Sequence, residues 1–318
     1  MPPVNRNDPK RAESSESQYS LMEFMREFPN DAACLDWLWC ERFAEDGAHA
    51  FCPSCDRERK FHKVNDRPAW DCDSCGHHIH PLAGTIFHKS STSLHLWFFA
   101  MHLMTSTRCG ISAKQLEREL GVTYKTAWRM ANLIRNELMS EDIGPLNGEV
   151  EIDETAWGGK PRLGDLAKYG GNTPHHAAAR WAAATKSTVF AMVERGGRVR
   201  AEIVPSRQAS TLQGRVIQYV LPESTIFTDE WHSYTGLRAH FSDHRRIRHT
   251  EKVYVSGDTH TQTIEGFFSN LKRGIAGTYH AVSTKWLQSY LDEYTWRYNH
   301  RQDDQSMFRT LLLRAARS

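Results

Sequence analysis

The sequence has 318 residues, with 40 Lys and Arg against 38 Asp and Glu, so its formal charge is only +2. This balance excludes a uniformly basic nucleic-acid-binding protein, and any such surface has to be local. Hydrophobic residues make up 40% of the chain, enough for a buried core, and no apolar run reaches the roughly 18 residues of a membrane helix. We therefore expect about two domains, no membrane partner and a cytoplasmic location.

Residues 1–20 are polar and lack the apolar core of a signal peptide, which predicts a disordered N-terminus. Apolar spacing from Leu21 to Glu45 then predicts helices. Cys52-Pro-Ser-Cys55 follows and, after a long loop, Cys72-Asp-Ser-Cys75. Two such turns are typical of a zinc ribbon, in which four thiolates hold one Zn²⁺ tetrahedrally. Because a redox dithiol would need only one turn, we predict that structural zinc binds Cys52, Cys55, Cys72 and Cys75.

A second helical region follows the cysteines. The apolar stretch Thr85–Thr107 predicts a core helix, and Ile111–Trp128 has the pattern of a helix-turn-helix with Gly121 at the turn. In that motif Lys125 and Arg129 would face a DNA groove. A plain helical hairpin without DNA contact is the open alternative.

The chain then changes to a strand pattern. Glu149–Thr155 alternates apolar and acidic residues, and a Gly-rich turn and a polar insertion, expected to be a mobile loop, follow it. Strands are predicted at Ser187–Glu194 and Val199–Val204, and helix Ala209–Tyr219 leads to a fourth strand at Ser224–Glu230. The first three strands should form an antiparallel meander, with the fourth parallel to the first after the helical crossover.

Three carboxylates converge in this layout. Asp153 ends the central first strand, Asp229 ends the fourth, and Glu265 lies on an amphipathic helix predicted for Thr261–Arg273. Such a set can hold two Mg²⁺ or Mn²⁺ about 4 Å apart, one activating a hydroxyl and the other stabilising the leaving oxygen of a phosphodiester. Any one acid alone could be a surface charge. Lys272, two helical turns after Glu265, shares its face.

Several neighbouring residues have more than one interpretation. We expect Glu149, Glu151 and Glu154 to face solvent or, at most, to support Asp153 from outside the metal site. Trp231 and Tyr234 could stack on an unpaired base or pack in the core. Basic residues grouped near the acids would neutralise phosphates, although any one of them alone could be a solvated charge. They are Arg245, Arg246, Arg248, His249, Lys272, Arg273, Arg297 and Arg301.

Together these motifs resemble one family, the bacterial insertion-sequence transposases of the ISXO type, which pair an N-terminal zinc ribbon with an RNase H-like DDE catalytic core. The similarity extends from about Leu21 to Arg301. The matching segments are the two cysteine turns, Ile152–Thr155 with Gly158–Lys160, Thr228–Asp229 with Tyr234, Thr263–Ser269 with Leu271–Gly274, and Arg297–Arg301.

The resemblance implies an activity and a set of partners. It implies binding to the terminal inverted repeats of an insertion sequence and metal-dependent cleavage and transfer of DNA strands into target DNA, by a homodimer or higher oligomer at the nucleoid. Asp153, Asp229 and Glu265 would be the metal ligands, and Lys272 would contact DNA near the cleavage site. Many relatives carry Asn where this chain has Gln262, and that Asn can serve as the third catalytic residue, so Gln262 is a reserve candidate.

Two other functions remain open, a DNA-binding regulator with an inactive core and a nuclease or junction resolvase of the same fold. The intact acids argue against the first, and the ribbon and helix-turn-helix argue against the second. We expect an α/β fold whose RNase H-like mixed sheet is flanked by helices. The predicted parts are a disordered N-terminus (1–20), a helical lead-in with the zinc ribbon (21–84), a helix-turn-helix region (85–146), an RNase H-like catalytic domain (147–301) and a C-terminal tail (302–318).

Overall fold

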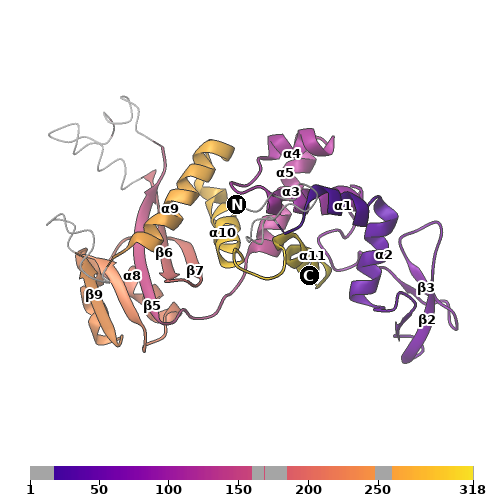
Figure 1. The fold of residues 1–318 in the computed structure, drawn as a ribbon, viewed down its shortest axis with the longest axis horizontal. Helices are drawn as coiled ribbons and strands as arrows, with labels where there is room; N and C mark the ends of the chain where they lie inside the picture. Colours follow the sequence, from indigo (N-terminus) through magenta and orange to yellow (C-terminus); the bar gives the residue numbers. More distant parts are fainter. Residues whose placement is uncertain (1–17, 160–167, 169–184, 248–259, 318) are drawn as a thin grey trace, which may run out of the picture. The chain divides into compact units, whose positions relative to one another are not determined.

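The computed structural model describes residues 18–159, 168, 185–247 and 260–317. Most of the predicted disordered N-terminus, most of the expected mobile loop, and Arg248 with His249 lie outside these residues. The chain divides into two compact units, one formed by Glu141–Asn299 and the other by the residues before and after it (Figure 1). Within the described ranges, no helix is both long enough and apolar enough to cross a membrane.

The first unit combines helices with a small antiparallel sheet. The sheet has the order β1-β2-β3-β4, and each neighbouring pair of strands is antiparallel. The elements of the unit are α1 (Leu21–Glu27), α2 (Asp31–Arg42), β1 (His49–Cys52), β2 (Arg57–Lys63), β3 (Trp70–Cys72), β4 (His78–Ile79), α3 (Leu94–Ser106), α4 (Ala113–Leu120), α5 (Tyr124–Leu133), the π-helical η2 (Ile134–Met139) and α11 (Met307–Arg317).

Helix α3 is the centre of this unit, because it contacts α1, α2, α4, α5 and α11. It is shorter than predicted, since it begins at Leu94, where the Ser93 hydroxyl accepts the Leu96 amide. The residues from Thr85 form turns instead. The Thr85 hydroxyl donates to Leu82 C=O at 2.8 Å and accepts the Phe87 amide at 3.2 Å. Such local side-chain bonds compete with the helical ladder.

The C-terminal segment 302–318, predicted only as a tail, contains helix α11. Its Leu311, Leu312 and Ala315 are fully buried, which is the spacing of a helix that covers a core. Phe308 lies against Phe24 of α1, with ring centroids 5.7 Å apart. Helix α11 and helix α1, far apart in the sequence, therefore pack in the same core.

The second unit is built on one five-stranded sheet. Its order is β7-β6-β5-β8-β9, with β5, β6 and β7 antiparallel and β8 and β9 parallel to β5. This confirms the predicted RNase H-like mixed sheet, with the crossover helix before the fourth strand. The elements are β5 (Glu149–Trp157), β6 (Ser187–Glu194), β7 (Val199–Val204), α8 (Ala209–Tyr219), β8 (Thr225–Asp229), the 3₁₀-helical η3 (His232–Ala239), β9 (Asp243–Ile247), α9 (Gln262–Gly274), the π-helical η5 (Ile275–Tyr279) and α10 (Thr284–Asn299).

Each face of the sheet is covered by different helices. Val150 and Ile152 point to the face that α8 and η3 cover, while Val189 and Ala191 of β6 point to the face that α9 and α10 cover. Residues paired across antiparallel strands share a face, and Ala191 is paired with Asp153. Asp153 therefore lies on the face of the sheet that α9 covers.

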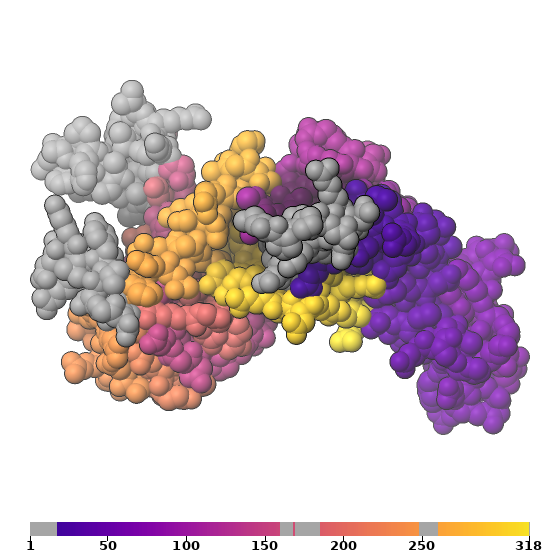
Figure 2. Space-filling model, viewed as in Figure 1, coloured from indigo at the N-terminus to yellow at the C-terminus, as the bar shows by residue number. Residues whose placement is uncertain are grey.

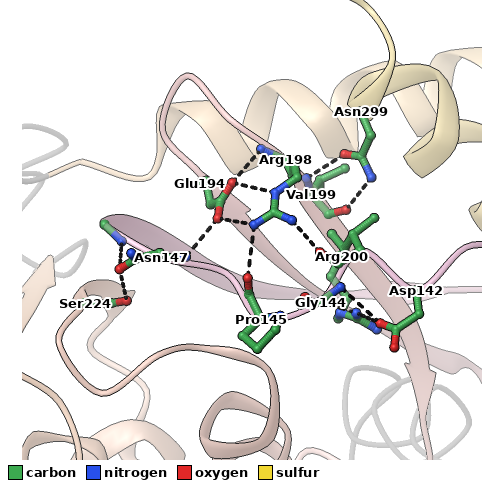
Figure 3. A network of polar contacts seen from close by, with 12 residues as sticks. Asp142, Gly144, Pro145, Asn147, Glu194, Arg198, Val199, Arg200, Ser224 and Asn299 are labelled. Atoms are coloured by element: carbon green, nitrogen blue, oxygen red, sulfur yellow. Dashed lines mark hydrogen bonds and ion pairs between the residues drawn. The ribbon is translucent and has the colours of Figure 1, made fainter.

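A polar network fixes the two ends of this unit to the β6–β7 hairpin (Figure 3). The Arg198 guanidinium donates to Pro145 C=O at 3.0 Å and pairs with Glu194 at 2.9 Å, and Glu194 accepts the Asn147 amide at 2.8 Å. At the other end, the Asn299 side chain bonds the Val199 amide at 2.8 Å and its carbonyl at 3.1 Å. The segments through which the chain enters and leaves this unit are thereby both bound to the β6–β7 hairpin.

Candidate active site

The four predicted zinc ligands lie together. Their sulfurs are all within 4.8 Å of one another, with 3.6 Å between Cys52 Sγ and Cys75 Sγ and 3.9 Å between Cys55 Sγ and Cys72 Sγ. Tetrahedral Zn–S bonds of about 2.3 Å would separate two sulfurs by about 3.8 Å. The cluster can thus hold one metal ion of the size and geometry of zinc. Cys52 and Cys72 are buried at the ends of β1 and β3, so the hairpins themselves set this spacing.

Asp153 and Asp229 lie on neighbouring parallel strands, just beyond the point where these strands pair. The last pair between β5 and β8 is Glu151 with Phe227, so each acid lies two residues past it on its own strand. Asp229 ends β8 as predicted, but Asp153 does not end β5, which continues to Trp157 along β6. Pairing with β8 stops at Glu151, so Asp153 lies where β5 loses its neighbour on that side.

The environment of Asp153 is negative. Burial raises the pKa of Asp153 to about 7, and the charges of Glu154, Asp229 and Glu265 act in the same direction. Asp153 Oδ1 accepts the Glu154 amide at 2.8 Å, and Asp229 Oδ1 accepts the Trp231 amide at 2.9 Å. Each of these bonds uses one oxygen of its carboxylate. Clustered carboxylate oxygens are the hard ligands that Mg²⁺ and Mn²⁺ prefer, so the residues fit a divalent cation.

Glu265 is on the first turn of α9, on the covered face of the sheet, and its exposed carboxylate accepts the Thr261 hydroxyl at 3.1 Å. The three acids are near enough for Asp229 and Glu265 to raise the pKa of Asp153. Among the residues that the structure describes, however, only the four cysteines already have their ligand atoms gathered for one ion. The three negative carboxylates repel one another. A bound divalent cation would compensate this repulsion and draw the carboxylates closer together.

Glu154 lies on the opposite face of β5. It is half-buried, and its carboxylate accepts a hydrogen bond from the Tyr234 hydroxyl. Burial raises the pKa of Glu154, and the charge of Asp229 adds to the effect. Tyr234 is fully buried, so of the two interpretations the core one is correct for it, whereas Trp231 is 42% exposed. Of the two alternatives for Glu154, full exposure to solvent is excluded, because Tyr234 covers its carboxylate.

Glu151 is the residue whose role the sequence least revealed. We expected it to face solvent or, at most, to support Asp153 from outside the metal site. Its side chain is fully buried, with bonds to Arg195 and to the N-terminus of α9, which excludes the first of these alternatives. The signal in the sequence was its position, two residues before Asp153 on the same face of a central strand. Its partner Arg195, just after β6, carried no signal of its own.

The remaining predicted residues of α9 are exposed on one helix, and the outer side of α9 is visible at the surface in Figure 2. Gln262 is its first residue. Lys272 is near its end, with its ammonium 5.8 Å from the Phe268 ring centroid. Lys272 also lines a cleft of about 370 Å³, together with Trp157 and Gly158 from the end of β5. The positively charged side chain of Lys272 therefore lies beside the C-terminal end of β5.

The structure distributes the other basic residues unevenly. Lys125 and Arg129 are exposed one turn apart on α5, which follows α4 after a turn where Gly121 has φ of 64°. Arg246 on β9 donates to the carbonyls of Glu230 and Trp231, so it stabilises the turn after Asp229. Arg273 is exposed on α9 and donates to the Asn270 side chain, and Arg248 lies outside the described residues.

Comparison with known proteins identifies similar sequences. Residues 145–299 match the ISXO2-like transposase domain. A protein from the transposable element ISH50 of Halobacterium salinarum is 28% identical over 248 residues, which cover 76% of this chain and 82% of that protein. A transposase-like protein of Haemophilus influenzae is 27% identical over 103 residues, covering 32% of this chain and 82% of its own length. The matched domain contains the sheet and α9, and thus all three acids.

Proposed function

This chain carries an ISXO2-like transposase domain and belongs with the insertion-sequence transposases, and from that premise we propose that it cleaves and joins DNA strands at the ends of its element. The observation that carries the proposal is the position of Asp153 and Asp229, each two residues beyond the last pair of the neighbouring strands β5 and β8, near the helix that bears Glu265. Carboxylates from two strands and a helix suit divalent-metal chemistry on phosphodiesters.

The residues of this chain divide the work. Asp153, Asp229 and Glu265 would hold Mg²⁺ or Mn²⁺, which supplies an activated hydroxyl and stabilises the leaving oxygen when bound. Lys272, exposed beside the end of β5, would neutralise a phosphate of the bound strand. The four carboxylates of the region, Glu154 included, would otherwise repel DNA, so cations are needed at its margin.

Recognition of the element would fall to the other unit. The four cysteines would hold Zn²⁺, which stabilises a hairpin too small for a large core. Lys125 and Arg129 on α5 would contact DNA, because both are exposed on one side of a helix that follows a tight turn. The substrates would be terminal inverted repeats and target DNA at the nucleoid, bound by two or more copies of the chain.

The test is a strand-transfer assay with zinc-loaded protein, Mg²⁺ and duplexes that end in the sequences flanking the gene. Sequencing of products should show nicks at the 3′ ends of the element and their joining to target DNA. We expect Glu265→Gln to abolish both steps, while Gln262→Ala leaves most activity. Glu223→Gln, an exposed acid before β8, is the control and should match the wild type. Loss of activity in the Gln262 variant with an active Glu265 variant would reverse the assignment of the third acid.

A further inference from the structure

A fully buried carboxylate lies beneath the N-terminus of the helix that carries Glu265. Glu151 is 0% exposed, on the covered face of β5 that it shares with Asp153. Its Oε2 accepts the Ile264 amide at 3.0 Å, and its Oε1 accepts the Thr263 hydroxyl at 3.0 Å. Two donors from the first turn of α9 thus converge on one side chain of the central strand.

Helix α9 does not cap itself. Thr261 occupies its N-cap position but makes no side-chain bond to the first-turn amides, and its hydroxyl donates to Glu265 Oε1 instead. The first amides of a helix have no partner within the helix, so another group has to satisfy them. Glu151 does so for Ile264, and its negative charge suits the positive end of the helix dipole.

The charge of Glu151 is compensated by a residue that joins three segments. Arg195 Nε lies 2.8 Å from Glu151 Oε1, Nη1 lies 3.0 Å from Glu149 Oε2, and Nη2 donates to His260 C=O at 2.8 Å. The same guanidinium lies 3.8 Å from the ring centroid of Phe227 on β8. Only Thr261 separates His260 from the first residue of α9, so Arg195 also fixes the segment that leads into the helix. Burying a carboxylate is costly without such a complete set of partners.

We propose that Glu151 is a positioning residue, which binds the first turn of α9 to β5 and thereby holds Glu265 near Asp153 and Asp229. Glu265 directly follows Ile264, so a bond to the Ile264 amide fixes the part of the helix that carries the ligand. The metal part of this inference rests on the proposed function, while the anchoring of α9 does not. Partners that orient metal ligands typically change metal affinity about 10- to 100-fold when removed.

A second buried carboxylate in the same unit provides a matched control. Glu293 on α10 is also 0% exposed, pairs with Arg297 at 3.1 Å and accepts the Tyr279 hydroxyl at 3.1 and 3.2 Å. It therefore resembles Glu151 in burial, in having an arginine partner and in accepting a hydroxyl. Its partners Arg297 and Tyr279 lie on α10 and η5 rather than on the first turn of α9, so its loss should leave the bonds of Glu151 to that turn in place.

The experiment compares Glu151→Gln with Glu293→Gln in the full, zinc-loaded chain. Gln keeps the size but replaces one acceptor oxygen by an amide donor, so Glu151→Gln cannot accept from both Arg195 and Ile264 as before. We expect Glu151→Gln to bind Mn²⁺ at least about tenfold more weakly than the wild type, as measured by calorimetry. Hydrogen exchange in the peptide covering residues 260–268 should also be faster than in the wild type. Glu293→Gln should lower the Tm but leave both values at wild-type level.

Equal behaviour of the two variants in Mn²⁺ affinity and in exchange of residues 260–268 would overturn the positioning role. If Glu151→Gln does not fold, Glu151→Asp keeps the charge on a shorter side chain and should change both readouts in the same direction. If the exchange result is as expected but Glu265→Gln binds Mn²⁺ as tightly as the wild type, the anchoring of α9 stands and the proposed function fails.

Discussion

The first prediction concerns acid stability and comes from His102, a buried histidine at the centre of the first unit. Its side chain is 3% exposed, and its ring lies 5.3 Å from the Phe24 ring and 5.5 Å from the Phe308 ring. In the described structure its Nδ1 has no hydrogen-bond partner. Burial lowers the pKa of His102 from 6.5 to about 4, because protonation would place a charge among aromatic rings.

The sign of the pH dependence of stability follows from which state, folded or unfolded, binds a proton on His102 more readily. Above pH 6.5 the ring is neutral in both states, and the stability is fully present. Between pH 6.5 and 4 the unfolded chain binds a proton that the folded chain does not, so the free energy of unfolding falls as the pH falls. The full difference corresponds to about 3 kcal/mol at about 1.4 kcal/mol per pKa unit. About 1–2 kcal/mol of it should be lost between pH 6.5 and 5.3.

The assay is urea unfolding of the wild type and His102→Phe at several pH values from 7.5 to 5.3, with zinc in excess. Phe retains an aromatic ring but cannot bind a proton, so its stability should fall less steeply with acid. Because every other titrating group is common to the two proteins, the difference between the curves isolates His102. Parallel curves over this range would refute the reasoning.

Three other predictions use different parts of the chain. Cys72→Ser should lose most of its bound zinc and destabilise the first unit, measured by metal analysis and thermal unfolding; a full zinc content would contradict the four-cysteine site. Gly274→Ala should destabilise the second unit by about 1–3 kcal/mol, because its Cβ would lie 1.8 Å from the hydroxyl of Tyr294, whereas Gly266→Ala, on the same helix with open space around it, should be neutral or stabilising in the same denaturation assay. Lys125→Ala should weaken binding to duplex DNA and reduce the slope of log K against log salt by about 1, and an unchanged slope would remove α5 from the interface.

The sheet of the second unit was predictable because alternation and turn residues determine strands locally. Ser187–Glu194, Val199–Val204 and Ala209–Tyr219 are observed with the predicted bounds. The handedness and crossover rules then fixed the pairing. Asp153 and Asp229 could be placed on neighbouring strands from sequence because the crossover helix α8, which follows β7, returns the chain to the free edge of β5, where β8 runs parallel to it.

Predictions from the sequence were incomplete where side chains that are far apart in the sequence contact one another. The sequence could not show that Glu151 receives Ile264 and Arg195, since that contact requires the helix to lie on the strand. Likewise, Tyr234 packs in the core and donates its hydroxyl to Glu154, while Trp231 three residues earlier remains exposed. The helix start was placed too early at Thr85 because apolar composition resembles a helix even where local hydroxyl bonds form turns.

The most direct measurement is strand transfer by Asp153→Asn in Mg²⁺, together with its affinity for the terminal DNA of the element. Asn is nearly isosteric but removes the negative charge from a carboxylate that lies near Asp229 and Glu265. We predict a loss of at least about a thousandfold in strand transfer, corresponding to about 4 kcal/mol, with unchanged DNA affinity and a normal Tm. Strand transfer at the wild-type rate by the folded, DNA-bound variant would contradict a metal-dependent site at Asp153.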